Sequence, residues 1–108
     1  MGWFSKRTYS DQVLANDIPD FIDILEEAGG ECQKGHYAKA SSLIKLLLSY
    51  VKEYIGTPGL SKGIPKQLND NIYEPLLLLS LELEKSNYFD LKLLKSIKKN
   101  FKRLRRVL

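Results

Sequence analysis

The segment YAKASSLIKLLLSYVKEYI, residues 37–55, is the most hydrophobic helical stretch of this 108-residue chain. Its apolar residues recur at steps of three and four, so they share one face of a helix. The face consists of Ala40, Leu43, Ile44, Leu47, Val51 and Tyr54, widened by Leu46, Leu48 and Ile55. We expect this helix at the centre of a bundle, with Leu47 fully buried. The turn signal Gly56-Thr57-Pro58-Gly59 ends it and opens a flexible loop over residues 56–64.

A second amphipathic stretch runs from Thr8 to Ala28 and begins with a sequence similar to a capping box, Thr8-Tyr9-Ser10-Asp11. Pro19 interrupts this stretch, removes one helical hydrogen bond and disfavours helical geometry at the residue before it. The stretch is therefore predicted to be kinked at Pro19 or split into two helices there. Gly29-Gly30 is its predicted end.

Two further stretches follow the loop. Pro65 to Lys85 has apolar residues at helical spacing, and Pro75 inside it again predicts a kink or a split. The last stretch, Leu91 to Leu108, is predicted to start from Asp90 as its N-cap. Its apolar stripe lasts only about two to three heptads, which favours packing within a bundle over an extended coiled coil. The stripe consists of Leu91, Leu94, Ile97, Phe101, Leu104 and Leu108.

The four stretches together predict an all-α fold, a mostly antiparallel four-helix bundle. Residues 1–108 would form a single domain and residues 1–7 an N-terminal arm. Hydrophobic residues make up 44% of the chain and charged residues 28%, the ordinary balance of a globular protein, which argues against wholesale disorder. The first residues lack the apolar stretch of a signal peptide, and the longest leucine run, Leu76 to Leu79, is far shorter than the ~20 residues of a membrane span. We therefore expect a cytoplasmic protein without a transmembrane span.

Residues suited to catalysis or metal binding are few. Cys32 is the only cysteine and His36 the only histidine, so the chain lacks the second pair of ligands that a zinc site needs. His36 is also the one side chain suited to act as a base near neutral pH, and no serine stands in a G-x-S-x-G turn. Residues 56–63 lack the spacing of a phosphate-binding loop. We expect no enzyme activity, no cofactor and no metal.

Charge is divided unevenly along the chain, although the net charge is only +4. Residues 91–108 carry eight cations and no acid: Lys92, Lys95, Lys98, Lys99, Lys102, Arg103, Arg105 and Arg106. Residues 8–33 carry seven acids and no lysine or arginine. The two segments either pair within the bundle or remain as solvated faces, or the basic helix meets an acidic partner.

An acidic protein, an anionic membrane surface and a nucleic acid all suit a basic amphipathic helix. Nucleic-acid binding would be non-specific, because only Ser96 and Asn100 accompany the cations on the polar side of this helix. Trp3 and Phe4 in the N-terminal arm either fold back on the bundle or form an apolar tip for a membrane or a partner. The eight cations and these two aromatic residues are the candidate partner-binding residues.

The predicted function is that of a non-enzymatic binding module: an adaptor, an inhibitor or an immunity-type protein. The small size, the helical content and the basic amphipathic last helix resemble those of the small helical bacteriocin immunity proteins. That resemblance implies a cytoplasmic protein, peripheral to the inner face of the membrane, that shields its host's membrane target from a peptide toxin. A non-specific nucleic-acid-binding protein is the remaining alternative.

Overall fold

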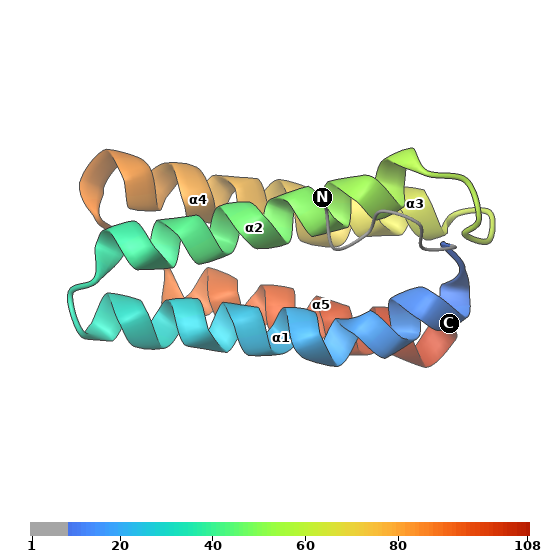
Figure 1. The fold of residues 1–108 in the computed structure, drawn as a ribbon, viewed down its shortest axis with the longest axis horizontal. Helices are drawn as coiled ribbons and strands as arrows, with labels where there is room; N and C mark the ends of the chain where they lie inside the picture. Colours follow the sequence, from blue (N-terminus) through green and yellow to red (C-terminus); the bar gives the residue numbers. More distant parts are fainter. Residues whose placement is uncertain (1–8) are drawn as a thin grey trace.

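The computed structural model describes residues 9–108, which form four helical columns (Figure 1). The columns are α1 (Asp11–Gln33), α2 (Tyr37–Gly56), the continuous run of α3 (Ile64–Leu68), the π-helical turn η1 (Asn69–Tyr73) and α4 (Glu74–Ser86), and finally α5 (Leu91–Val107). Successive columns run in opposite directions, and residues 9–108 contain no strand. The predicted all-α, antiparallel four-helix bundle is confirmed.

No column lies at the centre of the bundle, so the prediction of a central α2 is wrong. Both α1 and α4 pack against α2 and α5, and the core is shared by one face of each column. Leu47 is fully buried, as predicted. Leu46 is 41% exposed and does not widen the buried face.

A buried polar contact joins α1 to α2 inside this core. The hydroxyl of Tyr54, which is fully buried, donates a hydrogen bond to the carboxylate of Asp17. The ring of Tyr54 also packs edge-on against the rings of Tyr9 and Phe21, at centroid distances of 5.0 and 6.2 Å. Hydrogen bonding compensates for the cost of burying a polar group, so this contact is compatible with an otherwise apolar core.

The first helix begins at Asp11 and not at Thr8, which lies outside the described residues. Ser10 has extended backbone geometry, and its hydroxyl oxygen accepts a hydrogen bond from the backbone N–H of Val13 at 3.2 Å, so Ser10 is the N-cap. The carboxylate of Asp11 accepts hydrogen bonds from the backbone N–H (2.9 Å) and the hydroxyl of Ser61. The connection between α2 and α3 is thereby attached to the start of α1.

The end of α1 corrects the sequence prediction as well, because Gly29 and Gly30 lie inside the helix. The helix ends at Gln33, three residues after Gly30, in a Schellman motif. Gly35 has a positive φ of 81°. Its N–H donates to the carbonyl of Cys32 (3.0 Å), and the N–H of His36 donates to the carbonyl of Glu31 (2.8 Å). A glycine inside a helix costs only about 1 kcal/mol, which tertiary packing outweighs here.

Pro19 does not split α1, which is continuous from Asp11 to Gln33. Proline has no N–H, so the carbonyl four residues earlier, that of Ala15, loses its helical hydrogen-bond donor. The side chain of Arg105 on α5 replaces that donor, with its Nε 3.2 Å from the Ala15 oxygen. The missing helical bond is thus replaced by a bond to another helix.

In the third column, too, a proline leaves a backbone carbonyl without its helical donor. The backbone widens into the π-helical turn η1 just before α4, and Pro75 occupies the first turn of α4. The carbonyl that Pro75 leaves without its α-helical donor belongs to Asn71. The side-chain amide of Asn100 on α5 donates to it at 2.8 Å. Both proline-freed carbonyls therefore receive hydrogen bonds from side chains of α5.

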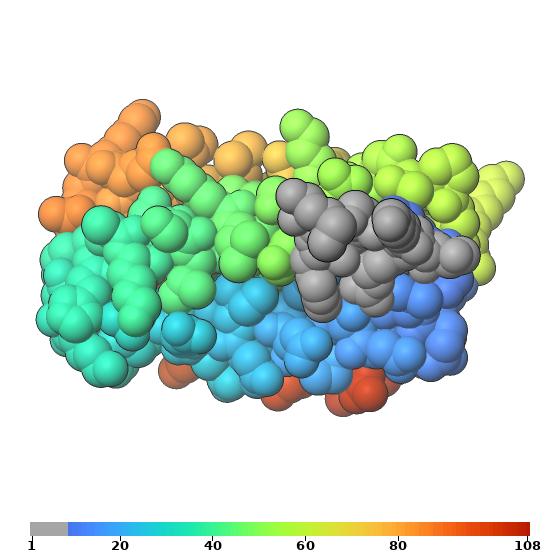
Figure 2. Space-filling view, viewed as in Figure 1, coloured from blue at the N-terminus to red at the C-terminus, as the bar shows by residue number. Residues whose placement is uncertain are grey.

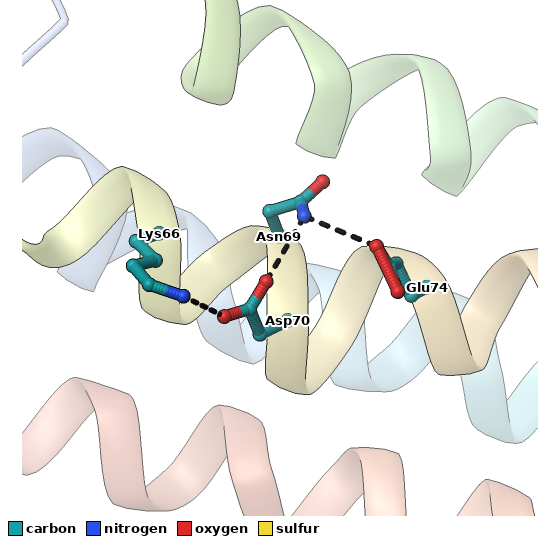
Figure 3. Close-up of polar contacts among 4 residues, drawn as sticks. All are labelled: Lys66, Asn69, Asp70 and Glu74. Carbon is teal, nitrogen blue, oxygen red and sulfur yellow. Dashed lines mark hydrogen bonds and ion pairs between the residues drawn. The ribbon is translucent and has the colours of Figure 1, made fainter.

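A small polar network follows the outside of the π-helical turn (Figure 3). The Lys66 ammonium lies 2.6 Å from a carboxylate oxygen of Asp70, and the amide of Asn69 donates to Asp70 (3.1 Å) and to Glu74 (3.3 Å). The hydrogen bond from Lys66, then that from Asn69, lower the pKa of Asp70. The five-residue step from Asn69 to Glu74 matches the wider π-helical turn that it spans.

Replacing Gly30 by alanine tests the corrected end of α1. A Cβ at this position would meet no atom within 4 Å, and the backbone there is helical, so Gly30→Ala should stabilise the protein by about 0.5–1 kcal/mol. Gly35→Ala is the matched control and should destabilise it, because φ at Gly35 is positive. Urea denaturation gives both values. Destabilisation by Gly30→Ala would mean that α1 ends at the glycine pair after all.

A double-mutant cycle tests the role of Asn100. Asn100→Ala should cost about 1 kcal/mol of unfolding free energy, because the Asn71 carbonyl loses its donor. In a Pro75→Ala background, residue 75 regains an N–H that can serve that carbonyl, so the cost of Asn100→Ala should fall close to zero. Equal costs in the two backgrounds would contradict the link between Asn100 and Pro75.

Candidate functional site

The fifth helix is oriented by contacts along its whole length. Asp90 caps it as predicted, since its carboxylate accepts a hydrogen bond from the backbone N–H of Leu93 at 3.1 Å. Four residues at helical spacing point into the core: Leu94, Ile97, Phe101 and Leu104. Asn100 and Arg105 bind the flanking columns on either side. These contacts leave only one side of α5 facing away from the bundle.

Six exposed cations occupy that remaining side: Lys92, Lys95, Lys99, Lys102, Arg103 and Arg106. We call this set the outer basic face. Within residues 9–108, no acidic side chain forms an ion pair with any of the six. At 1.5 Å per residue the face is about 21 Å long. The view of α1 and α2 in Figure 2 shows α5 only along the lower edge of the molecule.

The other two predicted binding cations have contacts within the bundle. The Lys98 ammonium lies 2.7 Å from a carboxylate oxygen of Glu26 on α1, and its side chain is only 23% exposed. Arg105 donates to the Ala15 carbonyl. Trp3 and Phe4, the two predicted aromatic contacts, lie outside the described residues. The structure therefore separates the eight cations of α5 into six on the outer basic face and two that contact α1.

Neutralisation of α5 by the acidic first helix is slight, although the two helices are neighbours. Within residues 9–108, Glu26 is the one acid of α1 that forms an ion pair with α5. Glu31 instead contacts His36 (2.7 Å) and Lys39 (3.5 Å) at the α1–α2 turn. Three further acids of α1 are exposed to solvent: Asp20, Asp23 and Glu27. The positive field of the outer basic face is thus left largely uncompensated by its neighbours.

A hollow of about 290 Å³ adjoins the outer basic face where α5 meets α3 and η1. Arg103 and Asn100 line it from α5, and Gln67 and Asn71 line it from the facing column. A guanidinium can donate two hydrogen bonds to one carboxylate, and side-chain amides can add further ones. The hollow thus offers polar groups suited to a carboxylate next to the row of cations.

Cys32 and His36 lie at the α1–α2 turn, away from the outer basic face. Cys32 is buried at the end of α1, and this burial raises the pKa of its thiol, which favours the unreactive protonated form. The ring of His36 is engaged with Glu31, and its hydrogen bond is the main cause of the lowered pKa of Glu31. Within residues 9–108, no three His, Cys, Asp or Glu side chains cluster closely enough to hold a metal ion.

No helix within residues 9–108 combines the length and the apolar character needed to span a bilayer. Comparisons with protein families, with curated proteins and with solved structures find no match to this chain.

The ion pair between Lys98 and Glu26 gives a pH-dependent prediction. The hydrogen bond from Lys98 is the main cause of the lowered pKa of Glu26. A carboxylate with a lowered folded-state pKa stabilises the protein above its ordinary value of 4.5, and this contribution is lost as the pH falls through the folded-state pKa. Lys98→Met should raise the pKa of Glu26 towards 4.5, as followed by NMR titration.

Lys92→Met is the control for that titration, because Lys92 lies on the outer basic face and does not contribute to the pKa of Glu26. It should leave the titration of Glu26 unchanged. An equal rise of the pKa in both variants would mean that the general field of α5, and not the ion pair, lowers the pKa of Glu26.

Proposed function

We propose that this protein is a non-enzymatic binding module whose outer basic face docks on an acidic partner protein. The observation that carries the proposal is the row of six exposed cations, none of them in an ion pair within residues 9–108. A helix that is packed in a core presents these charges in a fixed arrangement, so little order has to be gained on binding. Complementary charge then favours fast association and selects acidic surfaces.

A protein partner suits this face better than a membrane does. A basic amphipathic helix binds a bilayer by inserting its apolar side between the lipids. The apolar side of α5 is packed in the core, where Ile97 and Phe101 are fully buried. The folded protein would therefore meet an anionic membrane through charge alone, which gives a weaker and more salt-sensitive contact.

A protein partner also suits the face better than a nucleic acid does. Asn100, one of the two residues considered for contacts to bases, already donates to the Asn71 carbonyl. The one aromatic residue of α5, Phe101, is fully buried and offers no surface on which a base could stack. The hollow beside Arg103 adds a site for a carboxylate of the partner. An adaptor, an inhibitor or a cytoplasmic immunity-type protein would each use these features to cover an acidic surface.

The test reverses three charges that are spread along the outer basic face, from its first cation to its last. Lys92, Lys99 and Arg106 are spaced by seven residues, all three are exposed, and they form no ion pair within residues 9–108. The triple variant Lys92→Glu, Lys99→Glu, Arg106→Glu should keep its melting temperature within a few degrees, because exposed substitutions usually change stability by less than ~0.5 kcal/mol each. Its affinity for a poly-glutamate peptide should fall at least tenfold.

The control triple variant carries the same charge change elsewhere: Lys34→Glu, Lys52→Glu and Lys62→Glu, at three other exposed positions. It should retain most of the binding, because its outer basic face is intact. Duplex DNA and vesicles of anionic lipid are measured alongside at several salt concentrations. Equal losses in the two triple variants would show that net charge alone governs binding. Stronger binding to DNA or to vesicles than to the peptide would contradict a protein partner.

A further inference from the structure

The outer side of α4 has an apolar ridge that nothing in residues 9–108 covers. Leu77, Leu78 and Leu81 are 39%, 51% and 46% exposed. The core does not need them, because α4 fills it with Leu76, Leu79 and Leu83, which are buried on the opposite side of the helix. Several large apolar side chains exposed together on one helix mark a surface that contacts another molecule.

The ridge forms part of a regular stripe along α4. Glu74, Leu78, Leu81 and Lys85 follow one another at steps of four, three and four residues, and all four are exposed. This spacing places them on one line along the helix and is that of the contact seam of a coiled coil. The stripe therefore has an acid at one end, a base at the other and leucines between them.

When the stripe is placed against a second copy of itself running in the opposite direction, leucine meets leucine and acid meets base. Two copies of α4 placed antiparallel, with the two-fold axis between residues 79 and 80, bring Leu78 of one copy opposite Leu81 of the other. The same arrangement brings Glu74 of each copy opposite Lys85 of the other. Both ionic and apolar contacts are then satisfied at once, as an isologous two-fold interface requires.

We propose that this chain forms a homodimer through an antiparallel α4–α4 contact. Lys85 forms no ion pair within residues 9–108, so its charge is available to a second copy. Glu74 accepts one hydrogen bond, from Asn69 at 3.3 Å through one carboxylate oxygen, which leaves the other oxygen for a cation (Figure 3). The proposal does not depend on the outer basic face, which lies on another helix.

The size of the contact indicates how strong the dimer is. From Glu74 to Lys85 the seam is about 17 Å long at 1.5 Å per residue. Each copy contributes three leucines and two charges, so the buried area falls at the lower end of the range for specific interfaces. The dimer is therefore weak, and the fraction of dimer rises with protein concentration. Sedimentation has to be followed up to roughly hundreds of micromolar protein.

Two single charge reversals test the pairing. Glu74→Lys places a lysine opposite Lys85 of the second copy, and Lys85→Glu places two glutamates opposite each other. Each variant alone should dimerise about tenfold more weakly than the wild type, because two attractive contacts become repulsive. An equimolar mixture of the two variants should recover the dimer, since every pair across the seam is again of opposite sign. A parallel contact would place each residue opposite its own copy, so neither single reversal would weaken that dimer, and an unrelated contact would be insensitive to both reversals.

A second pair of variants separates the ridge from other exposed leucines. Leu78→Glu together with Leu81→Glu should give a monomer at every concentration with an unchanged helical spectrum. Leu46→Glu, at an equally exposed position on α2, should leave the dimer intact. A wild-type protein that sediments as a monomer throughout would overturn the proposal, as would a dimer that persists in the double leucine variant. A monomer that loses vesicle binding on Leu78→Glu, Leu81→Glu would assign the ridge to a membrane.

Discussion

Two backbone carbonyls that lose their helical donors to proline fix how α5 lies in the bundle. Ala15 and Asn71 belong to the two columns that flank α5, and both of their carbonyl oxygens accept hydrogen bonds from its side chains. Arg105 and Asn100 therefore hold the helix from opposite sides. With the apolar residues turned into the core, the rotation of α5 about its own axis is determined. The six remaining cations then have no direction to face except outwards.

The character of the candidate site follows from that rotation. A different rotation of α5 would turn cations towards α1, where acids could neutralise them, and would expose part of the apolar stripe. As it is, only Lys98 lies close enough to an acid of α1 to form an ion pair within residues 9–108. The outer basic face thus lies on α5, and the leucine ridge lies on a separate helix, α4. Charge and apolar contact area are carried by different parts of the molecule.

Much of this fold could be predicted from hydrophobic periodicity, because periodicity reports which side of each helix is buried. Leu47 in the core and Asp90 as the cap of α5 are examples. The end of α1 could not be predicted from the glycine pair, because the cost of two helical glycines is smaller than the gain from packing the further turn of helix that ends at Gln33. The roles of Asn100 and Arg105 were also missed. Proline shows which carbonyl lacks a donor, but only the folded chain shows which side chain supplies one.

The buried hydrogen bond between Tyr54 and Asp17 has a consequence for how α1 and α2 are aligned along their length. Apolar surfaces of two helices can slide past each other by one turn and still bury a similar area. A slide of one turn, about 5.4 Å, would separate this hydroxyl from its carboxylate and leave polar groups poorly satisfied in the core. This polar pair thus favours one axial alignment of the first two helices among those that hydrophobic contact alone would accept.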